Sequence, residues 1–218
     1  ERVEKYSYLK FPFLKKIGWK GFVDGPESGV YMATPLSRLN AADGMATPLA
    51  QQEYEKMFST LGGKPVKKLL ATHWARLVEL MYASERLLEL SEDPETASPD
   101  IRTVPTATPE EGVGIVEAMR GILTHHYQTD RNGLVTKANL IVGTTNNNAP
   151  ISMSIKRAAQ KLITPGKEIG QGLLNMVEMA FRLYDPCFSC ATHSLPGEMP
   201  LIIEVIDAHG EVVHREGR

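Results

Sequence analysis

The only two cysteines of this 218-residue chain lie three positions apart, in the stretch Asp185-Pro186-Cys187-Phe188-Ser189-Cys190-Ala191-Thr192-His193. Cysteines this close together cannot tie distant segments to one another, so the disulfide frameworks of small secreted domains are excluded. The fold must depend on a hydrophobic core instead. A chain of this length, with 42% hydrophobic residues, is long enough to bury one.

Composition narrows the class of protein further. Charged residues make up 23% of the chain and the net charge is −2, which is typical of an ordered globular protein without a basic nucleic-acid surface. No apolar run approaches the roughly 18 to 20 residues of a membrane span. The chain does not open with the regions of a secretory signal. We therefore expect a cytoplasmic protein, although an export signal on a partner subunit would change its location.

Apolar residues at three- and four-residue steps predict a long helix over residues 65–90. The apolar stripe consists of Leu69, Leu70, His73, Leu77, Leu80, Met81, Ser84, Leu87 and Leu88. We expect this face to pack into the core of a helical bundle, with His73 as a buried, hydrogen-bonded polar group. Further helices are predicted over residues 48–60, 152–163 and 167–184.

Two segments predict β-hairpins. Residues 121–129 and 134–142 alternate as strands do, and Asp130-Arg131-Asn132-Gly133 between them contains Asn-Gly, the strongest short turn signal. Residues 200–214 contain a second strand–turn–strand pattern. The predicted fold class is α+β: a predominantly helical bundle with one β-hairpin in the middle and another at the C-terminal end.

The cysteine pair is the part of the sequence with the clearest chemistry. A tight turn between two thiolates brings both sulfurs to one side, where they can bind one soft metal ion. A structural zinc half-site and a redox dithiol are alternatives. A zinc site needs two more ligands that a second cysteine pair would supply, and the redox dithiol normally follows a βαβ pattern, which is absent from the sequence.

The full string Asp-Pro-Cys-x-x-Cys-x-x-His resembles the C-terminal signature of the large, catalytic subunit of nickel-iron hydrogenases. Residues 117–127 resemble the arginine segment of that family, with Met119 in place of its usual proline. Residues 31–48 and 72–79 resemble its cytoplasmic branch, and the methyl-viologen-reducing type is the most similar. The matching segments occur in order along nearly the whole chain, so the resemblance implies a fragment of the hydrogenase large-subunit fold.

The resemblance implies roles for the residues of a Ni-Fe centre. Cys187 would be a terminal nickel ligand, and Cys190 would bridge nickel and iron. Arg120 would place its guanidinium over the open coordination position, and Asp185 would hold that guanidinium by charge-assisted hydrogen bonds. An ordinary structural ion pair between Arg120 and Asp185 is the alternative.

Three residues match the pocket around the cyanide and carbonyl ligands of the iron: Leu123, Gly143 and Thr144. Gly143 replaces the proline of other branches, and its N–H and the Thr144 hydroxyl would both be donors to cyanide. His193 matches the C-terminal histidine that binds magnesium or a similar divalent cation, and the carbonyl of Leu140 is a weaker candidate for that ion.

The family's maturation protease cleaves after this histidine once nickel is bound. We therefore expect residues 1–193 to be the C-terminal portion of the large-subunit domain. Residues 194–218 would be an extension that is removed by cleavage between His193 and Ser194.

The family's second cysteine pair, in an Arg-x-Cys-Gly-x-Cys motif, and its proton-relay glutamate are absent from this sequence. The first residue, Glu1, is no initiator methionine, so we interpret the chain as the C-terminal part of a longer protein, or as one of two polypeptides that make up the large subunit. With an iron–sulfur small subunit, it would cleave H2 reversibly into protons and electrons, and alone it would be inactive. The alternatives are a non-catalytic scaffold related to the quinone-site subunit of respiratory NADH dehydrogenase, and a zinc or redox CxxC protein.

Overall fold

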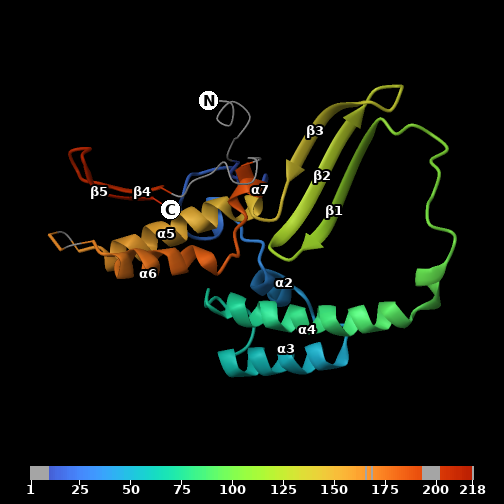
Figure 1. Cartoon of the computed structure of the whole chain (residues 1–218), viewed down its shortest axis with the longest axis horizontal. Helices are drawn as coiled ribbons and strands as arrows, with labels where there is room; N and C mark the ends of the chain where they lie inside the picture. The colour runs from blue at the N-terminus through green and yellow to red at the C-terminus, as the bar shows by residue number, and fades with distance from the viewer. Residues whose placement is uncertain (1–9, 165, 168, 193–201, 218) are drawn as a thin grey trace. The chain divides into compact units, whose positions relative to one another are not determined.

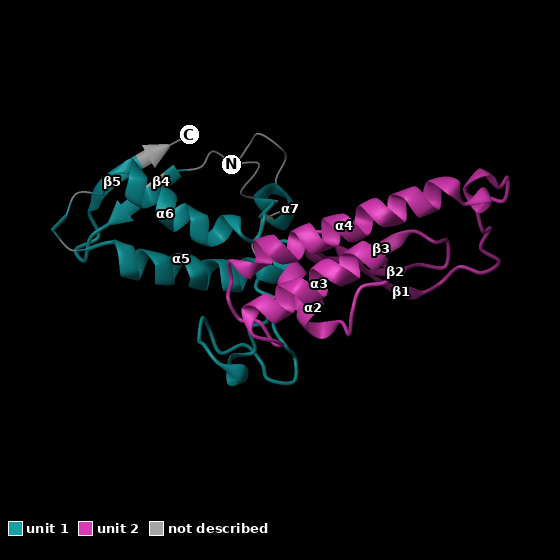
Figure 2. Cartoon of the chain, turned by 90° about the horizontal axis from the view of Figure 1, so that it is seen from below, with its two compact units in different colours: residues 1–31, 144–218 teal, residues 32–143 magenta. Residues whose placement is uncertain are grey.

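The computed structural model describes residues 10–164, 166–167, 169–192 and 202–217. The chain divides into two compact units, which Figure 2 distinguishes by colour. One unit, here the helix–sheet unit, comprises residues 32–143. The other, here the thiol unit, comprises residues 1–31 and 144–218.

Three helices form the core of the helix–sheet unit: α2 (Pro35–Ala41), α3 (Pro48–Leu61) and α4 (Ala71–Glu92). A threonine–proline pair begins each of the first two, because proline suits the first helical position. At α2 the Thr34 hydroxyl accepts a hydrogen bond from the N–H of Ser37 at 3.3 Å. The α3 helix was predicted correctly, whereas α2 was missed although it carries the same signal. A short 3-10 helix, η2 (Pro94–Ala97), follows α4.

The buried side chains of these helices come mainly from one face of each. Together with Val66, from the segment between α3 and α4, they form the core cluster: Leu36, Leu39, Tyr54, Met57, Phe58, Val66, Ala71, Ala75 and Val78. Asn40 joins α2 to the segment before α4, because its side-chain amide donates to the carbonyl of Val66 at 2.8 Å and accepts from the N–H of Val66 at 2.9 Å. This reciprocal pair satisfies both backbone groups of Val66, which itself is buried.

The prediction that the leucine stripe of α4 lies in the core is wrong for this chain. Leu77 is 63% exposed and Leu87 is 71% exposed, and His73 is exposed beside the guanidinium of Arg76. The buried face of α4 consists of Ala71, Thr72, Ala75 and Val78. Small residues allow α3 and α2 to approach closely, so the large leucines are left on the outer face.

A three-stranded antiparallel sheet completes this unit, in the order β1 (Glu111–Ala118), β2 (Gly121–Thr129) and β3 (Val135–Ile141). The predicted hairpin of β2 and β3 is confirmed. Asp130 begins its turn, where one carboxylate oxygen accepts the N–H groups of Asn132 at 2.8 Å and Leu134 at 3.0 Å. The sequence did not indicate β1, which contains two glycines and is exposed along almost its whole length.

In the thiol unit, α5 (Asn148–Leu162) and α6 (Gln171–Arg182) lie side by side, as Figure 1 shows. The smaller elements are the 3-10 helices η1 (Pro26–Ser28) and η3 (Thr145–Asn147), the short helix α7 (Phe188–Thr192), and the hairpin of β4 (Ile202–Ile206) and β5 (Val212–Gly217). The predicted C-terminal hairpin is therefore confirmed, and so is the α+β class. No helix within the described ranges is long and apolar enough to cross a membrane.

Candidate metal centre

The two cysteines lie at the start of α7, where a sharp reversal follows α6. Asp185 has a φ of 50°, in the left-handed region, which aspartate tolerates better than most residues. Pro186 follows and leads into α7, whose first turn is closed by the N–H of Ala191 donating to the carbonyl of Cys187 at 3.0 Å. Cys187 and Cys190 are joined as a disulfide, with Cα atoms 5.3 Å apart. The backbone alone therefore brings both sulfurs to one side of the turn.

Thr144 fixes this turn from a distant part of the sequence. The N–H of Cys187 donates to the Thr144 hydroxyl oxygen at 2.9 Å, and Thr144 is only 3% exposed. A hydroxyl that accepts one hydrogen bond still has its own proton to donate. The next residue, Thr145, is fully buried, and its hydroxyl has no hydrogen-bond partner among the residues with described positions.

The segment that carries Thr144 is held by hydrogen bonds from other parts of the thiol unit. The Tyr31 hydroxyl donates to the Asn146 side-chain oxygen at 2.5 Å, and the Asn148 amide donates to the carbonyl of Lys10 at 2.8 Å. Burial raises the pKa of Tyr31, so its hydroxyl stays protonated and remains a donor. A buried polar segment that is tied this way presents Thr144 in one position.

Tyr184, directly before Asp185, anchors the end of α6. Its side chain is 2% exposed, and its hydroxyl oxygen lies 3.0 Å from the Ser154 hydroxyl on α5. Burial raises the pKa of Tyr184, while the hydrogen bond with Ser154 acts in the opposite direction. Tyr184 therefore joins α6 to α5 one residue before the reversal that positions the cysteines.

The predicted catalytic arginine lies in the other unit, at the turn between β1 and β2. Arg120 is half-buried there. Gly143 lies against it: a Cβ atom on Gly143 would be 3.3 Å from the Cβ of Arg120. Leu123 and Leu140 lie in β2 and β3 and are half-buried. Two of the predicted residues of the diatomic-ligand pocket, Leu123 and Gly143, therefore belong to the same unit as Arg120.

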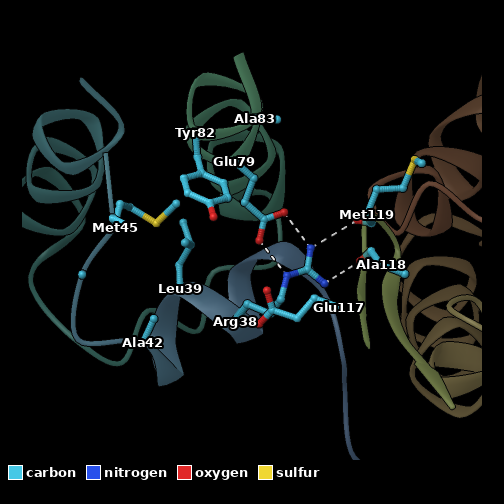
Figure 3. Close-up of a pocket in the computed structure, with 12 residues that line it drawn as sticks. Arg38, Leu39, Ala42, Met45, Glu79, Tyr82, Ala83, Glu117, Ala118 and Met119 are labelled. Atoms are coloured by element: carbon cyan, nitrogen blue, oxygen red, sulfur yellow. Dashed lines mark hydrogen bonds and ion pairs between the residues drawn. The ribbon is translucent and has the colours of Figure 1, made fainter. Parts of the chain in front are cut away.

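Sequence reasoning missed two residues at this turn, Arg38 of α2 and Glu79 of α4. Figure 3 shows the guanidinium of Arg38 between the carboxylate of Glu79 and the backbone of the turn. Arg38 Nε donates to Glu79 Oε1 at 2.7 Å, and Nη2 donates to Oε2 at 2.6 Å. Arg38 belongs to the segment that resembles the cytoplasmic hydrogenases, which was the only signal for it in the sequence.

Several predicted contacts stay predictions. Arg120 and Asp185 belong to different units, so their predicted hydrogen bonds are not tested. His193 and Ser194 lie outside the described residues. Within the described part of the chain, no three side chains of the Cys, His, Asp and Glu types gather where they could hold a metal ion.

Comparison with known proteins identifies the family. The profile of the family described as nickel-dependent hydrogenase matches residues 1–193. The chain therefore belongs to the nickel-dependent hydrogenase large-subunit family, as the cysteine signature indicated. Within this family its relatives include the F420-non-reducing, or methyl-viologen-reducing, hydrogenases, so the predicted branch is confirmed.

Three relatives illustrate the similarity. The chain is 54% identical to an F420-non-reducing hydrogenase iron-sulfur subunit of Archaeoglobus profundus, over 98% of this chain and 44% of that protein. It is 40% identical to the beta subunit of the NAD-reducing hydrogenase HoxS of Cupriavidus necator, over 100% of this chain and 43% of that protein. A crystal structure of an NAD+-reducing [NiFe]-hydrogenase in the H2-reduced state superposes with a TM-score of 0.71 and 36% identity, over 78% of this chain and 37% of that one. The chain thus spans less than half the length of these relatives.

The residues present fit part of a Ni-Fe centre. In the reduced form, Cys187 and Cys190 are two neighbouring thiols on one turn, and thiolates are ligands for soft metal ions. The hydroxyl of Thr145, which has no hydrogen-bond partner among the described residues, and the hydroxyl proton of Thr144 are polar groups in a buried place, and such groups normally have partners. The thiol unit therefore contains two cysteine sulfurs that could bind a metal and, bonded to the same turn, a threonine hydroxyl that could donate a hydrogen bond.

Proposed function

We propose that this chain is the C-terminal part of the catalytic subunit of a nickel-iron hydrogenase, which cleaves H2 heterolytically and reversibly. One observation carries the proposal. The consecutive residues Gly143 and Thr144 each contact a predicted site residue within their own unit, Gly143 at Arg120 and Thr144 at Cys187. Four residues that the family signature singles out separately in the sequence therefore form two contacting pairs.

The two cysteines have the ligand role. After reduction of the disulfide the two thiols lie on one turn. Cys187 would be a terminal nickel ligand and Cys190 would bridge nickel and iron, as the family resemblance implies. The Ni-Fe centre, whose iron has cyanide and carbonyl ligands, supplies the redox chemistry when it is bound. Thr144 fixes the backbone of Cys187. Its own proton would be available to a cyanide nitrogen of the bound centre, and the N–H of Gly143 would be a second donor.

Arg120 and Asp185 form the charged part of the proposed site. The guanidinium of Arg120 has a fixed positive charge and a planar fork of donors, with which it polarises the bound substrate. Asp185 orients that guanidinium through charge-assisted hydrogen bonds. Leu123 supplies an apolar wall to the pocket for the small ligands of the iron.

A divalent cation, such as magnesium, is proposed at His193, with the carbonyl of Leu140 as a second ligand. We also propose that a maturation protease cleaves between His193 and Ser194. The family match ends at residue 193, whereas the similarity to the Archaeoglobus relative covers 98% of the chain. The relative therefore shares the extension, as expected for a segment that is present before maturation. Intact-mass spectrometry of the mature chain checks this, and a chain that ends anywhere but at His193 contradicts it.

Further protein must complete the site, since two thiols are half of the four that the family uses. The proposed partner is the remaining part of the large subunit, either in the same polypeptide or in a separate one, with the second cysteine pair. The relatives are more than twice as long as this chain, and the leucine face of α4 is exposed, with Leu80 at 60% and Leu88 at 62%. Several large apolar side chains exposed on one face of a helix are typical of a surface that another protein covers. An iron–sulfur small subunit would accept the electrons, and we propose that the complex is cytoplasmic.

Hydrogen-dependent reduction of methyl viologen by the purified complete complex tests this function. The native complex should reduce the dye, and Cys187→Ser and Cys190→Ser should each abolish the reaction, because a serine hydroxyl stays protonated at neutral pH and cannot replace a soft thiolate ligand. Ser189→Ala, between the two cysteines, is the matched control and should retain activity. A metal-replete native complex that does not react with H2 would favour the scaffold alternative instead.

A further inference from the structure

The turn between β1 and β2 is clasped by one side chain from another element. We propose that Arg38, which Glu79 holds in place, is a positioning residue that fixes the backbone on both sides of Arg120 and thereby the direction of the Arg120 side chain. The inference rests on the proposed function of Arg120, and it assigns a role in that function to a salt bridge between α2 and α4.

Every N–H group of the Arg38 guanidinium donates a hydrogen bond within the protein. One edge, Nε and Nη2, is bound to both carboxylate oxygens of Glu79. Nη1 donates to the carbonyls of Ala118 at 2.7 Å and Gly121 at 2.6 Å, and Nη2 also makes a longer contact of 3.4 Å with the carbonyl of Met119. A guanidinium has five N–H donors, and each of them has an acceptor here. No donor remains for a substrate, so the role of Arg38 is positioning.

The geometry requires arginine. Residues Ala118 and Gly121 face each other across the hairpin, with Met119 and Arg120 as the two residues of the turn between them. One nitrogen of Arg38 binds both of these carbonyls and so ties the two ends of the turn together. A lysine ammonium is a single point charge without a planar fork, so it cannot hold Glu79 and both carbonyls at once.

The hydrogen bonds from Arg38 to the carbonyls of Ala118, Met119 and Gly121 are here called the clasp. Glu79 makes the clasp rigid. The side chains of Arg38 and Glu79 are only 13% and 21% exposed, so water competes little for either partner. A bidentate pair also restricts the guanidinium in rotation, which a single hydrogen bond does not. Through Arg38 and Glu79, the position of the turn backbone therefore depends on the two packed helices α2 and α4.

The turn and the strand that leads into it are open to solvent. The Met119 side chain is 69% exposed, and β1 is exposed along almost its whole length. A cavity of about 520 Å³ borders the clasp and is lined by Arg38, Glu79, Glu117, Ala118 and Met119 among others (Figure 3). The turn consequently has space to move into when the clasp is removed.

Gly143 restrains Arg120 from the other side. The backbone of Gly143 lies so close that an added Cβ would be 3.3 Å from the Cβ of Arg120 and 3.7 Å from its carbonyl carbon. The clasp holds the residues before and after Arg120, and Gly143 blocks movement of its Cβ. Together these contacts fix the direction in which the guanidinium of Arg120 leaves the turn, which matters because small displacements of a catalytic group reduce rates strongly.

The test uses the complete complex with Arg38→Lys and, in case that variant does not fold, Glu79→Gln. The control is Arg86→Lys, which changes the exposed pair of Arg86 and Glu89 on α4, where the two atoms are 2.5 Å apart. The first readout is amide hydrogen exchange at residues 119–121. We expect exchange there to become about tenfold faster in Arg38→Lys, less so in Glu79→Gln, and to be unchanged in the control. If hydrogen exchange at residues 119–121 is unchanged in both test variants, the proposal that Arg38 holds the turn is overturned.

The second readout asks whether Arg38 acts through Arg120. Arg38→Lys should lower kcat for H2 oxidation by at least about tenfold with little change in KM, and the double variant with Arg120→Lys should be no slower than Arg120→Lys alone. If the decreases in kcat of the two single variants multiply in the double variant, Arg38 and Arg120 act independently, and the proposal is overturned. The hydrogen-exchange measurement does not need the metal. A native complex without nickel would refute the proposed function. Exchange at residues 119–121 would still decide whether Arg38 holds the turn.

Discussion

The backbone N–H of Cys187 donates to the side-chain oxygen of Thr144, which precedes it by 43 residues, at a distance of 2.9 Å. This bond makes the position of the first thiol depend on a buried segment at the start of α5. Replacement of the threonine is therefore expected to affect both the stability of the thiol unit and the environment of its cysteines.

Thr144→Val keeps the shape of the side chain and removes the acceptor. The N–H of Cys187 is then left without its partner, which should lower the free energy of unfolding by about 1–3 kcal/mol. Chemical denaturation of the purified protein measures this. In the metal-loaded complex the cyanide stretching bands should also move, because the donor to cyanide is lost, and unmoved bands would count against that role.

Thr145→Val is the matched control for this change. Thr145 is as buried as Thr144, but its hydroxyl has no partner within the described part of the chain. Removal of an unsatisfied buried hydroxyl should leave the stability of the metal-free protein unchanged or slightly higher. If Thr145→Val lowers the free energy of unfolding as much as Thr144→Val does, the effect of Thr144→Val comes from burial at this segment and not from the hydrogen bond to Cys187.

Asp185 combines a backbone requirement with a charge. Asp185→Asn should fold normally, because asparagine also tolerates the left-handed conformation, but it should reduce H2 turnover at least about tenfold if the charge orients Arg120. Asp185→Ala should cost a further ~1 kcal/mol of stability, since alanine adopts a φ of 50° less readily. Turnover assays and thermal unfolding separate the two effects. Full activity of Asp185→Asn would refute the orienting role.

Gly143→Ala tests the close contact with the catalytic arginine. The new Cβ would meet the Cβ of Arg120 at 3.3 Å, so Arg120 must shift by a few tenths of an ångström. We expect kcat to fall severalfold with little loss of metal. Gly112→Ala in β1 is the control, because its added Cβ meets no atom within 4 Å. Equal effects of both substitutions would contradict the explanation.

The pH dependence of stability should include a contribution from Glu85. Its carboxylate accepts hydrogen bonds from the Thr47 hydroxyl at 2.6 Å and from the N–H groups of Leu49 and Ala50, and so caps the start of α3. These bonds, with that of Thr47 the largest, lower the pKa of Glu85 below its ordinary value of 4.5. The folded state then binds fewer protons than the unfolded state, so this stabilisation is present above pH 4.5 and is lost as the pH falls through the lower pKa.

Glu85→Gln should remove that part of the pH dependence. Unfolding curves of the native and variant proteins should differ most at neutral pH and converge as the pH falls well below 4.5. Thermal unfolding across a pH series measures the difference. A constant difference at all pH values would show that Glu85 does not titrate with folding.

Local signals in the sequence predicted the local structure well. The hairpin around Asn132 and Gly133 follows from turn chemistry within a few residues. The short spacing of Cys187 and Cys190 likewise indicated that both sulfurs lie on one turn. The α2 helix was missed although Thr34 and Pro35 carry the same signal that identified α3. The signal was present there, and the interpretation failed to use it.

Features that depend on tertiary contacts could not be predicted in the same way. The stripe of α4 that includes Leu77 is correct as a helical pattern, but which face is buried depends on what packs against it. The clasp of Arg38 joins residues more than 40 positions apart in sequence, and no local pattern indicates that an arginine will bind the carbonyls of a distant turn. The bond between Thr144 and Cys187 is of the same kind.

Metal analysis of the purified complete complex tests the central claim most directly. We expect the native complex and Ser189→Ala to contain nickel together with iron, with iron in excess because the small subunit has iron–sulfur clusters, and we expect Cys187→Ser and Cys190→Ser to lose the nickel. Zinc in place of nickel, or nickel that remains in both cysteine variants, would contradict the account.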